Sequence, residues 1–286
     1  MFPNPLARRS LVALLVSVAV LGGCGLEVQR GVEVEASPAA VGDAAARTVS
    51  AGGLTYSAVL AYDVQPAEQA GAAFLNGIEI TLAGRYESES GRLEASLDPD
   101  SFSGIGAGVV GDIATVTDPE AGAFIVQDDP PNGPWVQWDL ATLNPQPGGA
   151  LVGSARMATL LELVGLSEAA VEAGGQAEVG GVDTAVLSTS FVPSEVLRGE
   201  SDTVVLQVLT GYADLAPMLD TPVPVELYVD QDRIVRRLVA TFDLAPVLAA
   251  SGMAVQVATE RVQLDVAAVG AGEAIEVPAG ATASPA

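Results

Sequence analysis

The side chain with the most distinctive chemistry in this sequence is that of Cys24, which directly follows Leu21-Gly22-Gly23. Its thiol can be converted to a thioether that carries diacylglycerol, and cleavage of the chain before it frees an amine for a further acyl chain. One acyl chain holds a protein at a membrane only reversibly, whereas two or more give stable attachment. The sequence contains 1 cysteine, which excludes a disulfide within one chain. We therefore predict that Cys24 is a lipid attachment site.

The residues before Cys24 have the three parts of a secretion signal. Arg8 and Arg9 form a positive segment, an uncharged apolar run extends from Leu11 to Leu21, and two small glycines follow. The apolar run has about 11 residues, whereas a membrane-spanning helix needs about 20. The four residues that end at Cys24 resemble the lipobox of bacterial lipoproteins. We expect a signal peptide over 1–23, cleavage before Cys24, and a mature chain that is lipid-anchored to the outer face of the cell membrane.

The composition removes most catalytic chemistry. All 12 basic residues are arginine, and the chain has 0 histidines. Without lysine there is no P-loop phosphate clamp, and without histidine there is no Ser-His-Asp triad and no ordinary zinc site. Paired carboxylates can hydrolyse glycosides without histidine, but no spacing singles out a pair among the 36 acidic residues. We expect a protein that is not an enzyme and needs no cofactor.

Oxygen ligands for calcium are available in loops of the sequence, but they lack the spacing of an EF-hand. We interpret them as solvated turns and expect no metal site. The residues are Asp98, Asp100, Asp128, Asp129 and Asn132.

The formal net charge of −24 bears on the partners of the chain. A surface this acidic repels the phosphates of nucleic acids and anionic lipid headgroups. We expect no nucleic acid partner, and attachment to the membrane through lipid on Cys24 alone. Solubility is a simpler reason for the charge than recognition of a basic partner.

The chain divides into segments of different composition. Residues 24–47 are rich in Ala, Gly, Val and Glu without a sustained period, which predicts a flexible tether. Residues 270–286 are mostly Ala, Gly, Ser and Pro, which predicts a disordered tail. Residues 48–269 lie between them and are long enough for one domain with a substantial core.

Alternation of apolar and polar residues dominates this domain and predicts antiparallel strands. Residues 77–98 have the pattern of a hairpin. Beyond Val255 the apolar residues stand first at odd-numbered and later at even-numbered positions. We therefore expect a bulge near Thr259-Glu260-Arg261, which would keep these apolar residues on one face of the sheet. The other predicted strands cover residues 54–64, 109–116, 122–127, 134–140, 176–179, 182–191, 223–229 and 234–244.

One segment has the period of a helix instead. Met157, Leu160, Leu161 and Val164 are spaced i, i+3, i+4, i+7, and Ser154 can cap the first turn. Ser167 and a later pair of glycines indicate a second short helix, so we predict helices within 154–173. The pattern of residues 203–220 permits either a strand or a helix.

The order of these elements resembles that of the actinobacterial LppX/LprAFG lipoproteins, relatives of the LolA/LolB carriers. The stretches that carry the resemblance are Trp135–Leu140, Val179–Thr184 and Pro222–Asp230. Arginine-only basic usage, with abundant Ala, Gly and Val, is also typical of the high-GC genomes of actinobacteria. The resemblance implies an α+β fold, in which a curved antiparallel sheet of the LolA-like half-barrel type wraps around a few helices and an apolar cavity takes acyl chains.

Composition points to such a cavity as well. The chain is 49% hydrophobic but only 5% aromatic, and small aliphatic side chains on a curved sheet leave volume that larger residues would fill. The same residue types would also form an ordinary core, so both interpretations stay open. The candidate lining residues are Trp138, Met157, Leu160, Leu161 and Val164.

Two functions follow from these observations. The first is a membrane-anchored lipoprotein that binds or carries a hydrophobic ligand, a lipid or an acyl chain, at the cell envelope. The second is a lipid-anchored sensor or adaptor that binds a protein partner. Co-purification of lipid with the soluble domain distinguishes the two.

Overall fold

A computed structural model describes residues 31–66, 77–97, 113–127, 130–139, 157–197, 219–250, 252, 254–270 and 272–284 of the chain. Val32–Ala286 form one compact unit. Cys24 and the predicted signal peptide lie outside the described residues, as do most of residues 203–220.

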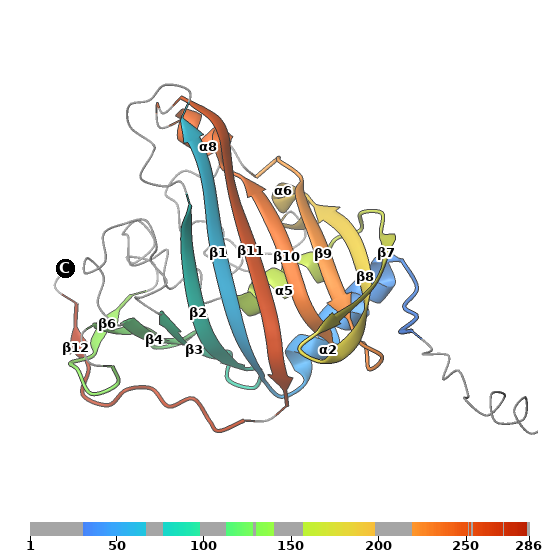
Figure 1. Cartoon of the computed structure of the whole chain (residues 1–286). Helices are drawn as coiled ribbons and strands as arrows, with labels where there is room; N and C mark the ends of the chain where they lie inside the picture. The colour runs from blue at the N-terminus through green and yellow to red at the C-terminus, as the bar shows by residue number, and fades with distance from the viewer. Residues whose placement is uncertain are drawn as a thin grey trace, which may run out of the picture. The chain divides into compact units, whose positions relative to one another are not determined.

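The unit is built on one 12-stranded sheet with the order β12-β6-β5-β4-β3-β2-β1-β11-β10-β9-β8-β7. Neighbouring strands are antiparallel except β12 and β6, which are parallel. The sheet curves around helices, as Figure 1 shows. The strands are β1 (Leu54–Pro66), β2 (Ile78–Glu87), β3 (Arg92–Leu97), β4 (Ile113–Asp118), β5 (Gly122–Gln127), β6 (Val136–Trp138), β7 (Glu172–Val179), β8 (Val182–Phe191), β9 (Val223–Val229), β10 (Val235–Asp243), β11 (Val255–Val269) and β12 (Thr282–Ala283).

The helices within the described residues are few and short, which agrees with the predicted α+β fold. They are α2 (Pro38–Ser50), α5 (Met157–Gly165), α6 (Pro193–Leu197) and α8 (Ala245–Ala250). Buried residues of α2 and α5 join one large core with one face of the sheet, which we call the concave face. Helix α8 lies where β1 ends and β11 begins, and α2 lies at the opposite end of these strands (Figure 1).

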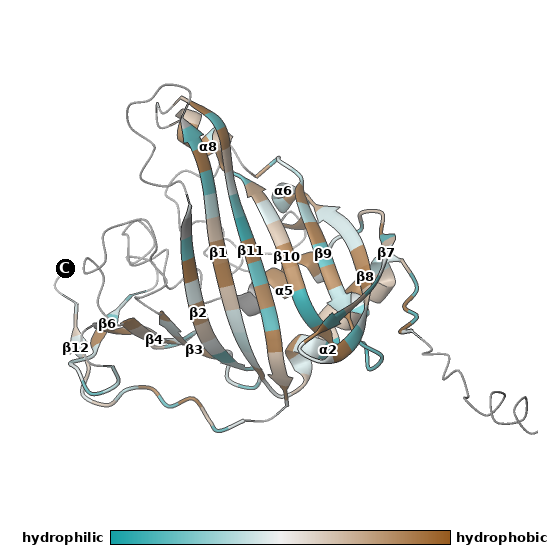
Figure 2. Cartoon of the chain, in the orientation of Figure 1, coloured by the Kyte–Doolittle hydropathy of each residue, from teal (hydrophilic) through white to brown (hydrophobic). Residues whose placement is uncertain are grey.

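The predicted alternation is confirmed along the central strands. In β9, Val223, Val225, Leu227 and Val229 are buried, while Pro224 and Glu226 between them are exposed. The brown and teal bands along β1 and β11 in Figure 2 show the same period. The period of two therefore places one apolar row on the concave face and one polar row on the opposite, convex face.

A helix occupies part of the segment predicted to be a tether. The Ser37 hydroxyl accepts a hydrogen bond from the Ala40 N–H at 3.2 Å, and Pro38 fits the first helical turn, where no N–H is needed. The tether prediction is therefore wrong from Pro38 onward. The apolar stripe of α2 is hard to recognise in the sequence because it is made largely of alanine and valine, which contrast little with their neighbours. Its buried residues are Val41, Ala44, Ala45, Thr48 and Val49.

Helices α2 and α5 approach each other through residues with small or absent side chains. A Cβ added to Gly42 would lie 3.0 Å from the Gly165 carbonyl oxygen, and one added to Gly165 would lie 2.9 Å from the Ala45 Cβ. Contacts this short leave no room for larger side chains. The glycines that weaken both helices as isolated segments therefore allow them to pack closely.

The second helix predicted within 154–173 is absent from its described part, where α5 ends at Gly165. Ser167 accepts a hydrogen bond from the Ala169 N–H at 3.2 Å, but its hydroxyl also donates to the Ser190 carbonyl at 3.1 Å, which ties the loop to β8. Strand β7 then begins at Glu172. Because β7 is an edge strand with mostly exposed side chains, the apolar period that would have revealed it is missing.

The C-terminal segment is ordered by contacts with the sheet, so the prediction of a disordered tail is wrong for residues 272–284. Ile275 is buried against Val116 and Phe124 on the convex face. The Arg92 guanidinium donates to the Ile275 carbonyl at 3.1 Å, and Arg85 donates to the carbonyl of Glu273 at 3.3 Å. One apolar residue and two arginines on the sheet thus hold a segment whose composition suggested disorder.

Candidate ligand-binding site on the concave face

The concave face is densely packed at the end covered by α2. Leu54 and Tyr56 of β1 and Leu238 of β10 are almost fully buried there. The Tyr56 ring lies against the backbone of β2, since a Cβ added to Gly84 would lie 2.4 Å from the Tyr56 Cζ. Burial raises the pKa of the Tyr56 hydroxyl, which keeps the phenol neutral. This end, which we call the closed end, is closely packed between α2 and the sheet.

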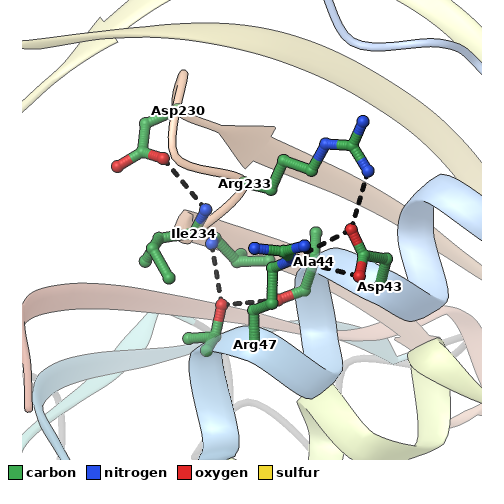
Figure 3. A network of polar contacts seen from close by, with 8 residues as sticks. Asp43, Ala44, Arg47, Asp230, Arg233 and Ile234 are labelled. Atoms are coloured by element: carbon green, nitrogen blue, oxygen red, sulfur yellow. Dashed lines mark hydrogen bonds and ion pairs between the residues drawn. The ribbon is translucent and has the colours of Figure 1, made fainter. Parts of the chain in front are cut away.

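Polar contacts also fix the closed end (Figure 3). The Thr48 hydroxyl donates to the Ala44 carbonyl at 2.7 Å and accepts a hydrogen bond from the Val235 N–H at 2.9 Å. Arg233, at a positive φ of 61°, donates to the Asp43 carboxylate at 2.8 Å. The hydrogen bonds from Arg233 and Arg47 lower the pKa of Asp43. Helix α2 is therefore joined to the turn between β9 and β10.

The same turn is organised by a buried carboxylate. Asp230 accepts hydrogen bonds from the N–H groups of Asp232 and Ile234 at 2.8 and 2.9 Å, and its other oxygen accepts from the Arg236 guanidinium at 2.7 Å. Its charge is thus matched by a cation and by backbone donors. Such complete pairing is typical of a buried acid with a structural role.

The candidate residues on α5 lie deep in the core. Leu161 and Val164 have no exposed surface, and Leu160 is 5% exposed. The backbone of Met157 begins α5, but its side chain is not among those described. Full burial suits both ordinary packing and the floor of a cavity, so the assignment of these residues to a ligand stays a prediction.

The two tryptophans lie on opposite faces of the sheet. Trp138 is half-buried and packs against the main core of the concave face. Trp135 packs on the convex face with Val116, Phe124 and Ile275. Only Trp138 therefore lies on the side where a ligand cavity was predicted.

At the end near α8, which we call the open end, apolar side chains of the concave face are only half-buried. They include Tyr62 of β1, Ile80 of β2 and Phe242 of β10, which pack against the core without being enclosed by it. In the strand register, Ile80 lies opposite Leu60, and Tyr62 and Phe242 lie opposite Glu260 from either side of β11. The helix α8 adds the half-buried Val247 and Leu248. These side chains form an accessible apolar surface within the curve of the sheet.

Glu260 of β11 lies among these apolar residues. It is 8% exposed, and its strand neighbours on the same face, Ala258 and Val262, are also buried. The Tyr62 hydroxyl donates a hydrogen bond to the Glu260 Oε1 at 2.9 Å. Desolvation raises the pKa of Glu260 to about 7, and the Tyr62 hydrogen bond opposes this shift. The open end therefore combines apolar surface with one titratable carboxyl group.

The bulge predicted near Thr259-Glu260-Arg261 is not observed there. The register of β1 and β11 shifts instead between Gln65 and Pro66 and between Thr55 and Tyr56. An assignment of the polar Glu260 to the solvent side misplaces the change of parity, because its side chain is buried in the same row as Ala258 and Val262. The break in the apolar pattern at Glu260 nevertheless indicates a carboxyl group that lies on the buried face of the strand.

Two further sequence predictions bear on other kinds of site. Among the described residues no group of three or more Cys, Asp and Glu side chains is placed to hold a metal ion, and of the loop residues weighed for calcium only Asn132 is described. No helix within the described ranges is both long and apolar enough to cross a membrane.

No family model and no curated protein matches the chain. The solved structures that it resembles include actinobacterial lipoproteins and LolA superfamily proteins. Lipoprotein LprF from Mycobacterium bovis is 16% identical with a TM-score of 0.44, and the match covers 86% of this chain and 100% of LprF. Lipoprotein LppX from Mycobacterium tuberculosis is 10% identical with a TM-score of 0.41, covering 84% and 98%. A LolA superfamily protein from Nitrosomonas europaea is 8% identical with a TM-score of 0.29, covering 85% and 96%.

Proposed function

We propose that this chain is a lipid-anchored lipoprotein of the cell envelope that binds or carries a hydrophobic ligand, a lipid or an acyl chain, at the open end of its concave face. The observation that carries the proposal is the half-burial of Tyr62, Ile80 and Phe242 on a face whose opposite end is completely packed. An apolar chain placed on these side chains would leave water, and each buried methylene contributes about 0.8 kcal/mol. A few methylenes therefore suffice for useful binding after the cost of association.

The two ends of the face suit different tasks. The closed end is held by the Gly42–Gly165 helix contact and by the Thr48–Val235 hydrogen bond, so it keeps the curvature of the sheet fixed. The open end can then present its apolar surface without collapse. A preformed surface loses less conformational entropy on binding than a flexible one.

Titration with a fluorescent acyl probe tests the proposal. We expect saturable binding to the unit Val32–Ala286, and a loss of at least tenfold in affinity for Ile80→Asp, which puts a charge on the open end. Val257→Asp is the matched control, because Val257 is an exposed apolar residue of β11 outside the core. Absence of saturable binding to the wild type, or equal loss in both variants, would contradict the proposal.

A second candidate function is a sensor or adaptor that binds a basic protein partner. The net charge of −24 favours it, because complementary charge steers association. This function requires no bound lipid. Unchanged partner binding in Ile80→Asp, with no ligand detected in the wild type, would support it over the carrier.

A further inference from the structure

We propose that Glu260 and Tyr62 form a polar subsite that hydrogen-bonds the hydroxyl head of an amphiphile whose aliphatic chain lies on the open end of the concave face. This inference rests on the proposed carrier function and adds the chemistry of the ligand's head. It is carried by the position of Glu260, by its incomplete hydrogen bonding, and by the absence of a nearby cation among the described residues.

The position of Glu260 is unusual for an acidic side chain. It lies between Ala258 and Val262 in a row of β11 that is otherwise apolar, and its cross-strand partners are Tyr62 and Phe242. Moving an ionised carboxyl from water into such surroundings is costly unless it is paired. The residue therefore weakens the fold unless another group compensates for the cost.

Comparison with the other two buried acids in the described part of the chain shows what Glu260 lacks. Asp230 is paired with Arg236 at 2.7 Å, and Asp118 is paired with Arg92 at 2.7 Å. Each of these aspartates also accepts two backbone N–H hydrogen bonds. Among the described residues, Glu260 has only the Tyr62 hydroxyl, on Oε1. No donor among the described residues bonds its Oε2, although a carboxylate oxygen can accept hydrogen bonds.

The arginines nearest in the strand register cannot supply the missing partner. Arg237 pairs with Asp265 on the convex face, and Arg261 donates to Gln263 at 3.2 Å on the same face. Helix α8, which lies beside the open end, contains only Ala, Pro, Val and Leu. A ligand is therefore the group best placed to donate a hydrogen bond to Oε2.

The chemistry of the site favours an uncharged donor. An ammonium head would have to lose its own hydration, which offsets much of its attraction to one carboxylate. A carboxylate head would repel Glu260 in its ionised form. A hydroxyl has a small desolvation cost, donates to a carboxylate, and can accept from the carboxyl when it is protonated. The subsite therefore selects an aliphatic alcohol group.

The test compares two probes of nearly equal length, 1-dodecanol and its methyl ether, by competition against a fluorescent acyl probe. A hydrogen bond to a charged group is stronger than one between neutral groups, so we expect the alcohol to bind wild type at least tenfold more tightly than the ether. Glu260→Met should remove this preference, and Tyr62→Phe should reduce it. Glu226→Met is the matched control, because Glu226 is an exposed acid that also pairs with a tyrosine, Tyr228, at 3.3 Å.

Each outcome decides something different. Equal affinity of alcohol and ether for the wild type would overturn the subsite and leave the carrier function standing. Tighter binding of dodecylamine or dodecanoate than of the alcohol would overturn the hydroxyl assignment. No binding of any probe would overturn the carrier function itself. If Glu260→Met fails to fold, the affinities of the alcohol and the ether for wild type and for Tyr62→Phe still decide whether the polar subsite exists.

Discussion

The hydroxyl of Thr48 in α2 accepts a hydrogen bond from the backbone N–H of Val235 in β10 at 2.9 Å, although the two residues are 187 positions apart. Both groups are buried, so neither can be satisfied by water. The bond joins the first helix of the unit to the strand that borders β11. It fixes α2 on the closed end and thereby supports the curvature that the open end requires.

Thr48→Val removes this acceptor while keeping the shape of the side chain. We expect the free energy of unfolding to fall by about 1–3 kcal/mol, because the Val235 N–H remains buried without a partner. Urea unfolding followed by circular dichroism measures the change. Thr55→Val, at an exposed position of β1, should change stability by less than about 0.5 kcal/mol. Equal effects of the two substitutions would show that the bond does not matter.

Gly84→Ala should lower the free energy of unfolding by more than the addition of one methyl group suggests. The added Cβ would lie 2.4 Å from the Tyr56 Cζ, and Tyr56 is almost fully buried. We expect a loss of about 1–3 kcal/mol or more from overpacking. Thermal unfolding measures it, with Gly272→Ala as the control, because nothing lies within 4 Å of that added Cβ. Tyr56→Leu combined with Gly84→Ala should recover part of the loss.

Glu260 should make stability depend on pH in an unusual direction. Its pKa is about 7 in the folded chain and 4.5 in the unfolded chain. Between these pH values the folded chain therefore binds more protons than the unfolded chain. The stabilising contribution is complete below pH 4.5 and is lost as the pH rises to 7. Its size is on the order of 3 kcal/mol. Glu260→Gln should lack this dependence, so the difference between the two urea midpoints across pH 4.5–7.5 is the measurement.

The sequence and the structure agree where the residues alternate clearly. The hairpin over 77–98, the strands 122–127 and 182–191, and the apolar row of β9 were all predictable, because a half-buried strand has a period of two. Helix α5 was predictable from Met157, Leu160, Leu161 and Val164 at helical spacing. The resemblance to LppX/LprAFG lipoproteins agrees with the structural neighbours found for the chain.

Elements that depend on small residues or on long-range contacts were not predictable. Helix α2 has an alanine-rich face, and its helix-starting signal at Ser37-Pro38 is only two residues long. The C-terminal segment is ordered by Arg85 and Arg92, which are far away in sequence. Glu260 was not identified as a site residue because an acid within an alternating strand is usually assigned to the solvent side.

Anchoring through Cys24 stays a prediction from the sequence. Cys24→Ala should move the protein from the membrane fraction to the soluble fraction, because the apolar run before it is too short to span a bilayer and the acidic surface does not adhere to anionic lipid. Fractionation in high salt measures the distribution. If a variant that lacks both the signal and the cysteine still sediments with membranes, another attachment must exist.

Photocrosslinking with an acyl chain that carries a diazirine tests the central claim most directly, because it shows where an apolar ligand lies. We expect saturable crosslinks to the open end of the unit Val32–Ala286, at Tyr62, Ile80 and Phe242, and competition by an unlabelled chain of the same length. Crosslinks that do not saturate, or that fall instead on the exposed Leu166 and Val257, would contradict a ligand-binding concave face.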